Sequence, residues 1–253
     1  MLFAVVLTSI CWVGIGYDGS CPLEPSRSVR QEARCASPTA PANGRVAVAF
    51  FGISRRLNSA LPFIERHVFD VLDRANITYD VFWHTVSTPS VQNSHAHEQG
   101  IAVNEYDAML MRPCRVTLVD QDVFSAQEFD RYCRTKNWKC SKSKNFDRDT
   151  TNSEKYNAGL WSNSFEDMRN RLNSLASQRE VLAMIREHAV QHDIQYDGIA
   201  ALRPDMAPIT DIDLPHHLPD MRDPAFADHV WVPDYQPFRG YHDRYGWCRG
   251  CVC

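Results

Sequence analysis

The chain has 253 residues, of which 44% are hydrophobic and 23% are charged, as is typical of a soluble globular protein. The formal net charge is −4 and no long basic tract is present, which argues against nucleic acid as a partner. This length suits one α/β domain or two small domains and is sufficient to bury a large core.

The N-terminal residues are typical of an exported protein. Residues 2–16 form an uncharged, mostly apolar run, shorter than the ~20 residues that a membrane-spanning helix needs. We expect residues 1–16 to be a signal peptide or a short signal anchor, with an ordinary buried segment as the third alternative. Residues 17–44 are rich in Ser, Pro, Ala and Arg and are expected to form a linker or stem. The expected location is the secretory pathway, in the ER or Golgi lumen or outside the cell, with membrane contact only through such an anchor.

Cysteine usage agrees with export. Nine cysteines are present, and eight remain when Cys11 of the apolar run is set aside. An even number permits disulfides without giving their connectivity, although Cys133 and Cys140 could close a local loop. Residues 248–253 form a Cys-rich tail, for which disulfide bonding or disorder is favoured over zinc because no second Cys/His pair has zinc-site spacing. Asn76 begins a sequon for N-glycosylation.

A folded domain is expected over residues 45–247, beginning with a βαβ unit. The continuous apolar run Val46–Phe51 is typical of a strand buried on both faces of a parallel sheet. A helix is predicted over about Leu57–Ala75 and a second strand over Asp80–Thr85. Three later short strands are predicted at Ala108–Met111, Ile199–Leu202 and Val230–Val232. Residues 134–157 are expected to form a polar loop, and one or two helices are predicted over about Phe165–His192. The alternation predicts an α/β fold with a mostly parallel central sheet flanked by helices.

The segment that follows the strand Ile199–Leu202 is the most informative one. Pro204 cannot donate to a sheet ladder, so the strand should end there and leave Arg203 and Asp205 at its carboxyl end. Ligands of open α/β sheets bind at this edge. A carboxylate there can hold a divalent metal, and an arginine can hold a phosphate. The structural alternative is an Arg–Asp pair that closes a turn.

Further candidate residues follow the first two predicted strands. Ser54, Arg55 and Arg56 lie just before a predicted helix, and helix N-termini attract phosphate. A solvated surface loop is the alternative for these three residues. His84 lies at the carboxyl end of the second strand, where a lone histidine is more often a packed, hydrogen-bonded residue than a base.

Two residues near the C-terminus complete the candidate chemistry. His242 and Asp243 place a base beside an acid, next to Arg244. A turn with an internal salt bridge is the structural alternative.

Several segments together resemble a poorly characterised family of glycosyltransferase-like proteins from algae, protists and large viruses. The segments occur in the order expected for the family and are Ala47–Arg55, Leu61–Glu65, Tyr79–Thr85, Tyr196–Asp205 and His242–Gly246. The last two resemble a family strand that ends in Arg-Pro-Asp and a family segment Asn-Asp-Arg-Phe-Ala-x-Gly, with histidine here in place of the first asparagine. The resemblance covers roughly residues 45–246 and implies a nucleotide-sugar-binding α/β fold of the GT-A type.

The resemblance also implies a function, the transfer of a sugar from a nucleotide-sugar donor to a hydroxyl of a glycan or protein acceptor. It places Asp205 where such enzymes keep a metal-binding acid, so Mn²⁺ or Mg²⁺ is the implied cofactor. It places the region of Asp243, with His242, against the acceptor, where either residue could remove the proton of the acceptor hydroxyl. The residues expected to contact the donor are Ser54, Arg55, His84 and Arg203.

The chain shows two further departures, one from the GT-A type in general and one from the family. Arg203-Pro204-Asp205 replaces the usual Asp-x-Asp metal motif, and the chain ends at Cys253 where relatives generally continue. A C-terminally truncated chain and a degenerate enzyme are therefore both open. The alternative function is a non-catalytic lumenal or secreted binding protein on the same fold.

Overall fold

The computed structural model describes residues 33–36, 43–93, 98–135, 165–223, 225, 230–231 and 245–248. These residues all belong to one compact unit, residues 32–253. The predictions made for residues 1–32, for most of the polar loop and for His242 and Asp243 lie outside the described residues.

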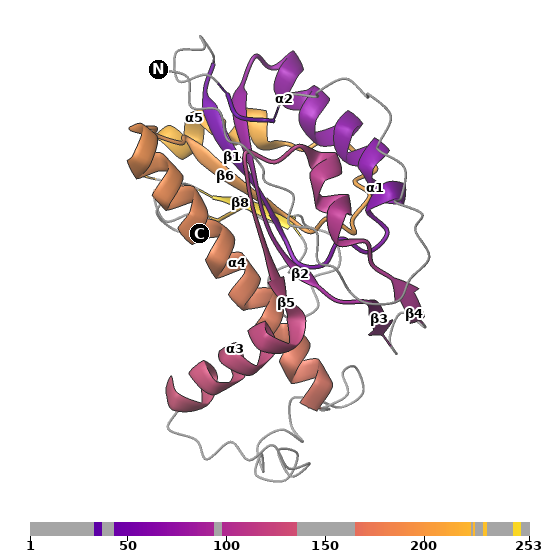
Figure 1. Ribbon diagram of the computed structural model, residues 1–253. Helices are drawn as coiled ribbons and strands as arrows, with labels where there is room; N and C mark the ends of the chain where they lie inside the picture. The colour runs from indigo at the N-terminus through magenta and orange to yellow at the C-terminus, as the bar shows by residue number, and fades with distance from the viewer. Residues whose placement is uncertain are drawn as a thin grey trace, which may run out of the picture. The chain divides into compact units, whose positions relative to one another are not determined.

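A six-stranded sheet in the order β5-β2-β1-β6-β8-β7 forms the centre of this unit (Figure 1). Its four parallel strands are β1 (Arg45–Phe51), β2 (Thr78–Ser87), β5 (Arg115–Asp120) and β6 (Gly198–Leu202). Two short antiparallel strands, β8 (Tyr245–Cys248) and β7 (Val230–Trp231), extend the sheet beyond β6. The predicted α/β class with a mostly parallel central sheet is therefore confirmed.

β1 is buried on both faces, as its continuous apolar run predicts. Its side chains alternate between two core clusters, which receive Val46, Val48 and Phe50 on one face and Ala47, Ala49 and Phe51 on the other. A strand with helices on both faces has no solvated side, which is why its sequence shows no polar alternation.

The helices cover the two faces of the sheet (Figure 1). One face carries α1 (Leu57–Ile64), a π-helical turn η1 (Glu65–Phe69), α2 (Asp70–Arg74) and α5 (Leu214–Arg222). The other face carries α4 (Phe165–His192), which contributes Val181, Met184 and Ile185 to the second cluster. The helix predicted over Leu57–Ala75 is confirmed, with the π-helical turn inside it, and Phe165–His192 is a single helix.

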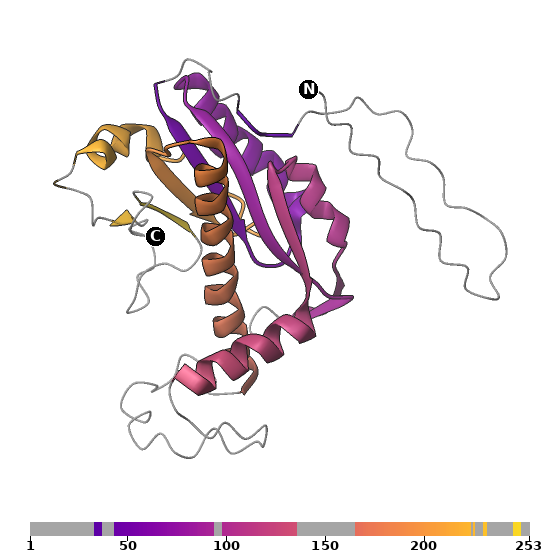
Figure 2. The same ribbon diagram turned by 60° about the vertical axis from the view of Figure 1, so that its left-hand side comes forward.

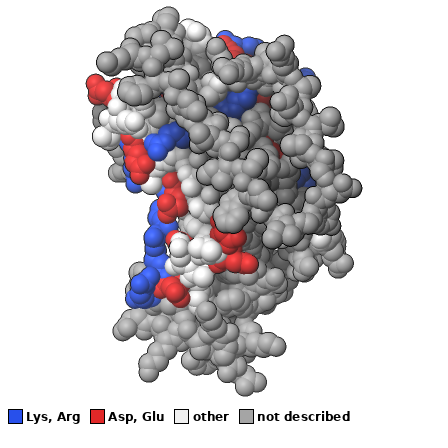
Figure 3. Space-filling view, in the orientation of Figure 1, with Lys and Arg blue, Asp and Glu red and all other residues white. Residues whose placement is uncertain are grey.

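α3 (Gln121–Thr135) packs against α4 and lies across its N-terminal part (Figure 2). Arg179 of α4 donates to both carboxylate oxygens of Glu128 of α3, at 2.9 and 3.0 Å, and also pairs with Glu180. Basic and acidic side chains of the described residues lie beside one another in Figure 3. Opposite charges are thus interspersed over this part of the surface.

One predicted strand is wrong and several elements were not predicted. Ala108–Met111 belongs to a 3₁₀ helix, η2 (Glu105–Met111), in which Ala108 and Met111 are buried while the two residues between them are exposed. That spacing of three fits a 3₁₀ helix and not a strand. The strand that follows this 3₁₀ helix is β5, which forms one edge of the sheet. The helices α3 and α5 were also missed, as was the hairpin of β3 (Ser90–Asn93) and β4 (Glu98–Ala102).

The short segment 33–36 is part of the folded unit although the sequence predicted a linker there. The backbone N–H of Arg34 donates to Arg112, and its carbonyl oxygen accepts from Val81. A disulfide joins Cys35 to Cys114, 79 residues further along the chain. Cys248 is disulfide-bonded as well. The segment 33–36, named the strap below, is therefore tied to the sheet covalently and by backbone hydrogen bonds.

Candidate functional site

The carboxyl ends of β1 and β6 form the point at which the sheet changes its winding direction. The chain continues from β1 to β2 on one side, whereas β6, much later in the sequence, pairs with the other side of β1. Because β1 and β6 are parallel neighbours, the loops that leave them begin side by side at the carboxyl edge of the sheet, where ligands of open α/β sheets bind. The loop after β1 carries Arg55, and the segment after β6 carries Arg203 and Asp205.

The structure brings these three predicted residues together. Nε of Arg55 lies 2.7 Å from Oδ2 of Asp205. Arg203 donates through Nε to Oδ1, at 3.0 Å, and through Nη2 to Oδ2, at 2.7 Å. The three side chains are partly accessible, with 17%, 25% and 11% of the Arg55, Arg203 and Asp205 side chains exposed. One carboxylate thus holds two guanidinium groups in a cluster that solvent can reach.

The electrostatics of this cluster favour an anionic ligand. Burial alone would raise the pKa of Asp205, but the hydrogen bonds and charges of Arg203 and Arg55 outweigh burial and hold it below its ordinary value. The carboxyl group is therefore ionised at neutral pH, and the two arginines and one carboxylate together carry one net positive charge. Arginine forks match the geometry of phosphate oxygens.

Ser54 positions the loop between β1 and α1. Its side chain is buried, and its hydroxyl donates to the carbonyl oxygen of Asn104 at 3.2 Å. Its carbonyl oxygen accepts from the N–H of Leu57, the first residue of α1. Arg56 follows in the left-handed region, with φ of 57°. Because the hydroxyl proton of Ser54 is already donated to Asn104, this residue anchors the loop. It is placed less well for the direct contact to a nucleotide sugar that the sequence predicted.

His84 is a packed residue that supports the same loop. The residue is 1% exposed, and its ring centroid lies 5.1 Å from that of Phe124. The Ser177 hydroxyl donates to the carbonyl oxygen of His84, so Nδ1 of His84, 2.9 Å from Oγ of Ser177, is the donor in their contact. Burial lowers the pKa of His84, which keeps the ring neutral.

Ser177 and Asn104 are site-supporting residues that the sequence analysis missed. Ser177 of α4 accepts from the N–H of Gly52 at 3.0 Å, where the chain turns out of β1 with φ of 93°. Asn104 supplies the carbonyl that fixes Ser54. Both residues lie far from the loop in sequence and in no recognisable motif. A serine on the apolar face of a long helix is the single local signal that could have indicated Ser177.

The chemistry around Asp205 fits a divalent metal poorly. Both of its oxygens accept hydrogen bonds from arginines, so a cation bound there would lie beside two guanidinium charges. Within the described segments, no group of three or more His, Cys, Asp or Glu side chains is arranged to hold a metal ion. Mn²⁺ or Mg²⁺ at Asp205 stays a prediction from the resemblance.

Comparison of the chain with models of protein families, with curated proteins and with solved structures finds no match. In the part of the chain that the structure describes, none of the helices is both long and apolar enough to span a bilayer.

Proposed function

We propose that this chain is a glycosyltransferase of the secretory pathway, with a GT-A type fold, that binds the diphosphate of a nucleotide-sugar donor between the carboxyl ends of β1 and β6. The observation that carries the proposal is the convergence of Arg55 and Arg203 on Asp205 at this edge of the sheet. The loops of two adjacent parallel strands thus supply a positive cluster where such folds bind ligands.

The proposed chemistry uses these arginines to stabilise the leaving group. When the bond between the sugar and the diphosphate breaks, negative charge develops on the diphosphate oxygens. Arg55 and Arg203 would donate hydrogen bonds to these oxygens, and charge-assisted bonds of this kind are the strong ones. Asp205 would hold both guanidinium groups in position before the donor arrives. Asp243 or His242 would take the proton of the acceptor hydroxyl.

Thermal stabilisation by nucleoside diphosphates tests this proposal. We expect UDP or GDP to raise the melting temperature of the purified full-length chain, because a ligand at about 100 times its Kd stabilises the folded state by ~2.7 kcal/mol. The matching nucleosides, which lack phosphate, are the controls and should have little effect. Absence of stabilisation by every nucleoside diphosphate would contradict the proposal and favour a non-catalytic binding protein on this fold.

The proposed secretory location predicts N-glycosylation at Asn76. This residue is exposed in the turn between α2 and β2, with φ of 53°, so a glycan can project into solvent. We expect a glycosidase-sensitive mobility shift in the full chain, abolished by Asn76→Gln and retained in Asn58→Gln, a change at an exposed asparagine outside any sequon. An unglycosylated chain, together with a reporter fused after Gly44 that stays in the cytosol, would contradict the secretory location.

A further inference from the structure

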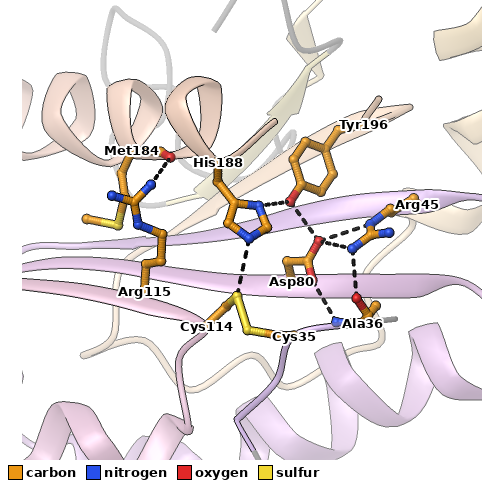
Figure 4. The surroundings of a disulfide bond; sticks show 9 residues. All are labelled: Cys35, Ala36, Arg45, Asp80, Cys114, Arg115, Met184, His188 and Tyr196. Atoms are coloured by element: carbon orange, nitrogen blue, oxygen red, sulfur yellow. Dashed lines mark hydrogen bonds and ion pairs between the residues drawn. A yellow bond between two sulfur atoms is a disulfide. The ribbon is translucent and has the colours of Figure 1, made fainter. Parts of the chain in front are cut away.

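The amino ends of the parallel strands carry a buried polar network that the proposed function does not use (Figure 4). Asp80 of β2 is fully buried and accepts from Arg45 of β1 and from the backbone N–H of Ala36 in the strap. The hydroxyl of Tyr196 also donates to Asp80, at 2.6 Å. His188 of α4 links this network to the disulfide, because its two ring nitrogens face Tyr196 and Cys114 respectively.

The hydrogen bonds decide which nitrogen of His188 carries the proton. Tyr196 has one hydroxyl proton, and Asp80 accepts it. Nδ1 of His188, 3.1 Å from the hydroxyl oxygen of Tyr196, must therefore be the donor in that contact. Nε2 of the neutral ring then carries a lone pair, and it lies 3.6 Å from Sγ of Cys114. A basic nitrogen is thus held against one sulfur of the disulfide.

The two sulfurs of the disulfide have different surroundings. Cys35 is exposed on the strap, whereas Cys114 is partly buried beside His188. Burial lowers the pKa of His188, against the opposing effect of the Asp80 charge, and the nearby His192, Arg115 and Arg45 lower it further. The ring is therefore neutral at pH 7 and its Nε2 is free of a proton. A thiolate in solution can approach Cys35. The sulfur that would then leave is that of Cys114, which lies beside His188.

We propose that Cys35–Cys114 is a thiol–disulfide exchange site, in which Cys35 is the sulfur attacked and Cys114 leaves as a thiolate paired with protonated His188. The thiolate of an external dithiol forms a bond to Sγ of Cys35, the S–S bond breaks, and Cys114 keeps the electron pair. The proton lost by the attacking thiol is bound, through solvent, at Nε2 of His188. The second thiol of the dithiol then attacks the first sulfur of the same dithiol, the bond between that sulfur and Cys35 breaks, and Cys35 takes the electron pair and, through solvent, the proton of the second thiol. The dithiol is thereby oxidised and the protein disulfide is reduced.

Reduction would remove the covalent tie between the strap and the domain. The strap would then be held by its backbone hydrogen bonds and by Arg34, which pairs with Glu65 and lies 3.6 Å above the centre of the Phe69 ring. The exchange site would thus set how firmly the strap is attached to the sheet.

The reactivity of Cys114 provides the test. In full-length Cys35→Ser, Cys114 is a free thiol, and its alkylation by iodoacetamide is followed by mass spectrometry of its peptide across pH. We expect the midpoint of the rate–pH profile to lie below that of the same thiol in the urea-unfolded chain. At pH 7 we expect alkylation to be ~tenfold faster than in Cys35→Ser/His188→Gln, because the thiol proton can pass to Nε2 of His188 and the imidazolium so formed favours the thiolate.

A second measurement uses the chain with its disulfide intact. Reduction of Cys35–Cys114 by dithiothreitol at pH 7 should be ~tenfold slower in His188→Gln than in the parent, since a leaving thiol of higher pKa leaves more slowly. In His216→Gln, a change at an exposed histidine of α5, the disulfide should be reduced at the parental rate. A Cys114 midpoint equal in the folded and urea-unfolded Cys35→Ser chains would overturn the proposal even if the His188 variant failed to fold. Equal reduction rates in the parent and a folded His188→Gln would also overturn it.

Discussion

Asp80→Asn is expected to lower the free energy of unfolding by about 3–5 kcal/mol, because removing one partner of a buried ion pair leaves the other charge uncompensated. Asp80 is fully buried, and its Oδ2 accepts from Nε and Nη2 of Arg45, at 3.0 and 2.8 Å, and from Tyr196. Its Oδ1 accepts from the N–H of Ala36 at 2.7 Å. An asparagine would keep one acceptor oxygen and turn an NH₂ group toward these donors.

Urea unfolding of the full-length chain, with its disulfides intact, measures this effect. Asp211→Asn is the matched control, because Asp211 is an exposed carboxylate paired with Arg74 and His67, and such pairs contribute little. A loss below about 1 kcal/mol in Asp80→Asn would contradict the prediction, given what a broken buried pair costs. Tyr196→Phe removes both hydrogen bonds of that hydroxyl, the one donated to Asp80 and the one accepted from His188, and should cost about 1–3 kcal/mol, which keeps the network testable if Asp80→Asn does not fold.

Arg203→Gln is expected to weaken the binding of nucleoside diphosphates by about 10- to 100-fold, on the basis of the proposed function. Hydrogen bonds to charged groups contribute about 1.5–3 kcal/mol, and each 1.4 kcal/mol is a factor of about ten in affinity. The change also removes the one net positive charge that Arg55, Arg203 and Asp205 carry together. The fold should be retained, since Arg203 is partly exposed and follows the last residue of β6.

Titration calorimetry with UDP and GDP, in EDTA and in Mn²⁺, measures this effect and tests the metal prediction at the same time. We expect the parent chain to bind in EDTA through its arginines. Arg74→Gln, at an exposed arginine of α2, should leave the affinity unchanged. Equal affinity in Arg203→Gln and the parent would contradict the phosphate site. Loss of parental binding in EDTA, with recovery in Mn²⁺, would instead support a metal at Asp205.

Local pattern predicted the elements that carry a clear period. The unbroken apolar run of β1 predicted a strand buried on both faces, and the helical spacing after it predicted the helix on one of those faces. Pro204 predicted the end of β6 and thus the position of Arg203 and Asp205 at its carboxyl end. These features depend on neighbours in the chain, because a strand or a helix repeats every two or 3.6 residues. The edge strand β5 was missed because it follows a short 3₁₀ helix whose apolar residues were read as a strand.

Tertiary structure alone decided which side chains meet. Arg55 and Asp205 are 150 residues apart in the sequence. The sequence predicted each of them as a site residue but did not predict that they form an ion pair. Their ion pair exists because β1 and β6 are neighbours in the sheet, a pairing that no local period encodes. For the same reason, the sequence permitted a disulfide but not its connectivity, and Asp80 was read only as the first residue of a strand. By itself the sequence determined the strands β1, β2 and β6, the helices over about 57–75 and 165–192, and the strand end at Pro204. Only the packing of distant segments decided the two charged clusters at opposite ends of the sheet, because a buried charge depends on partners that other strands supply.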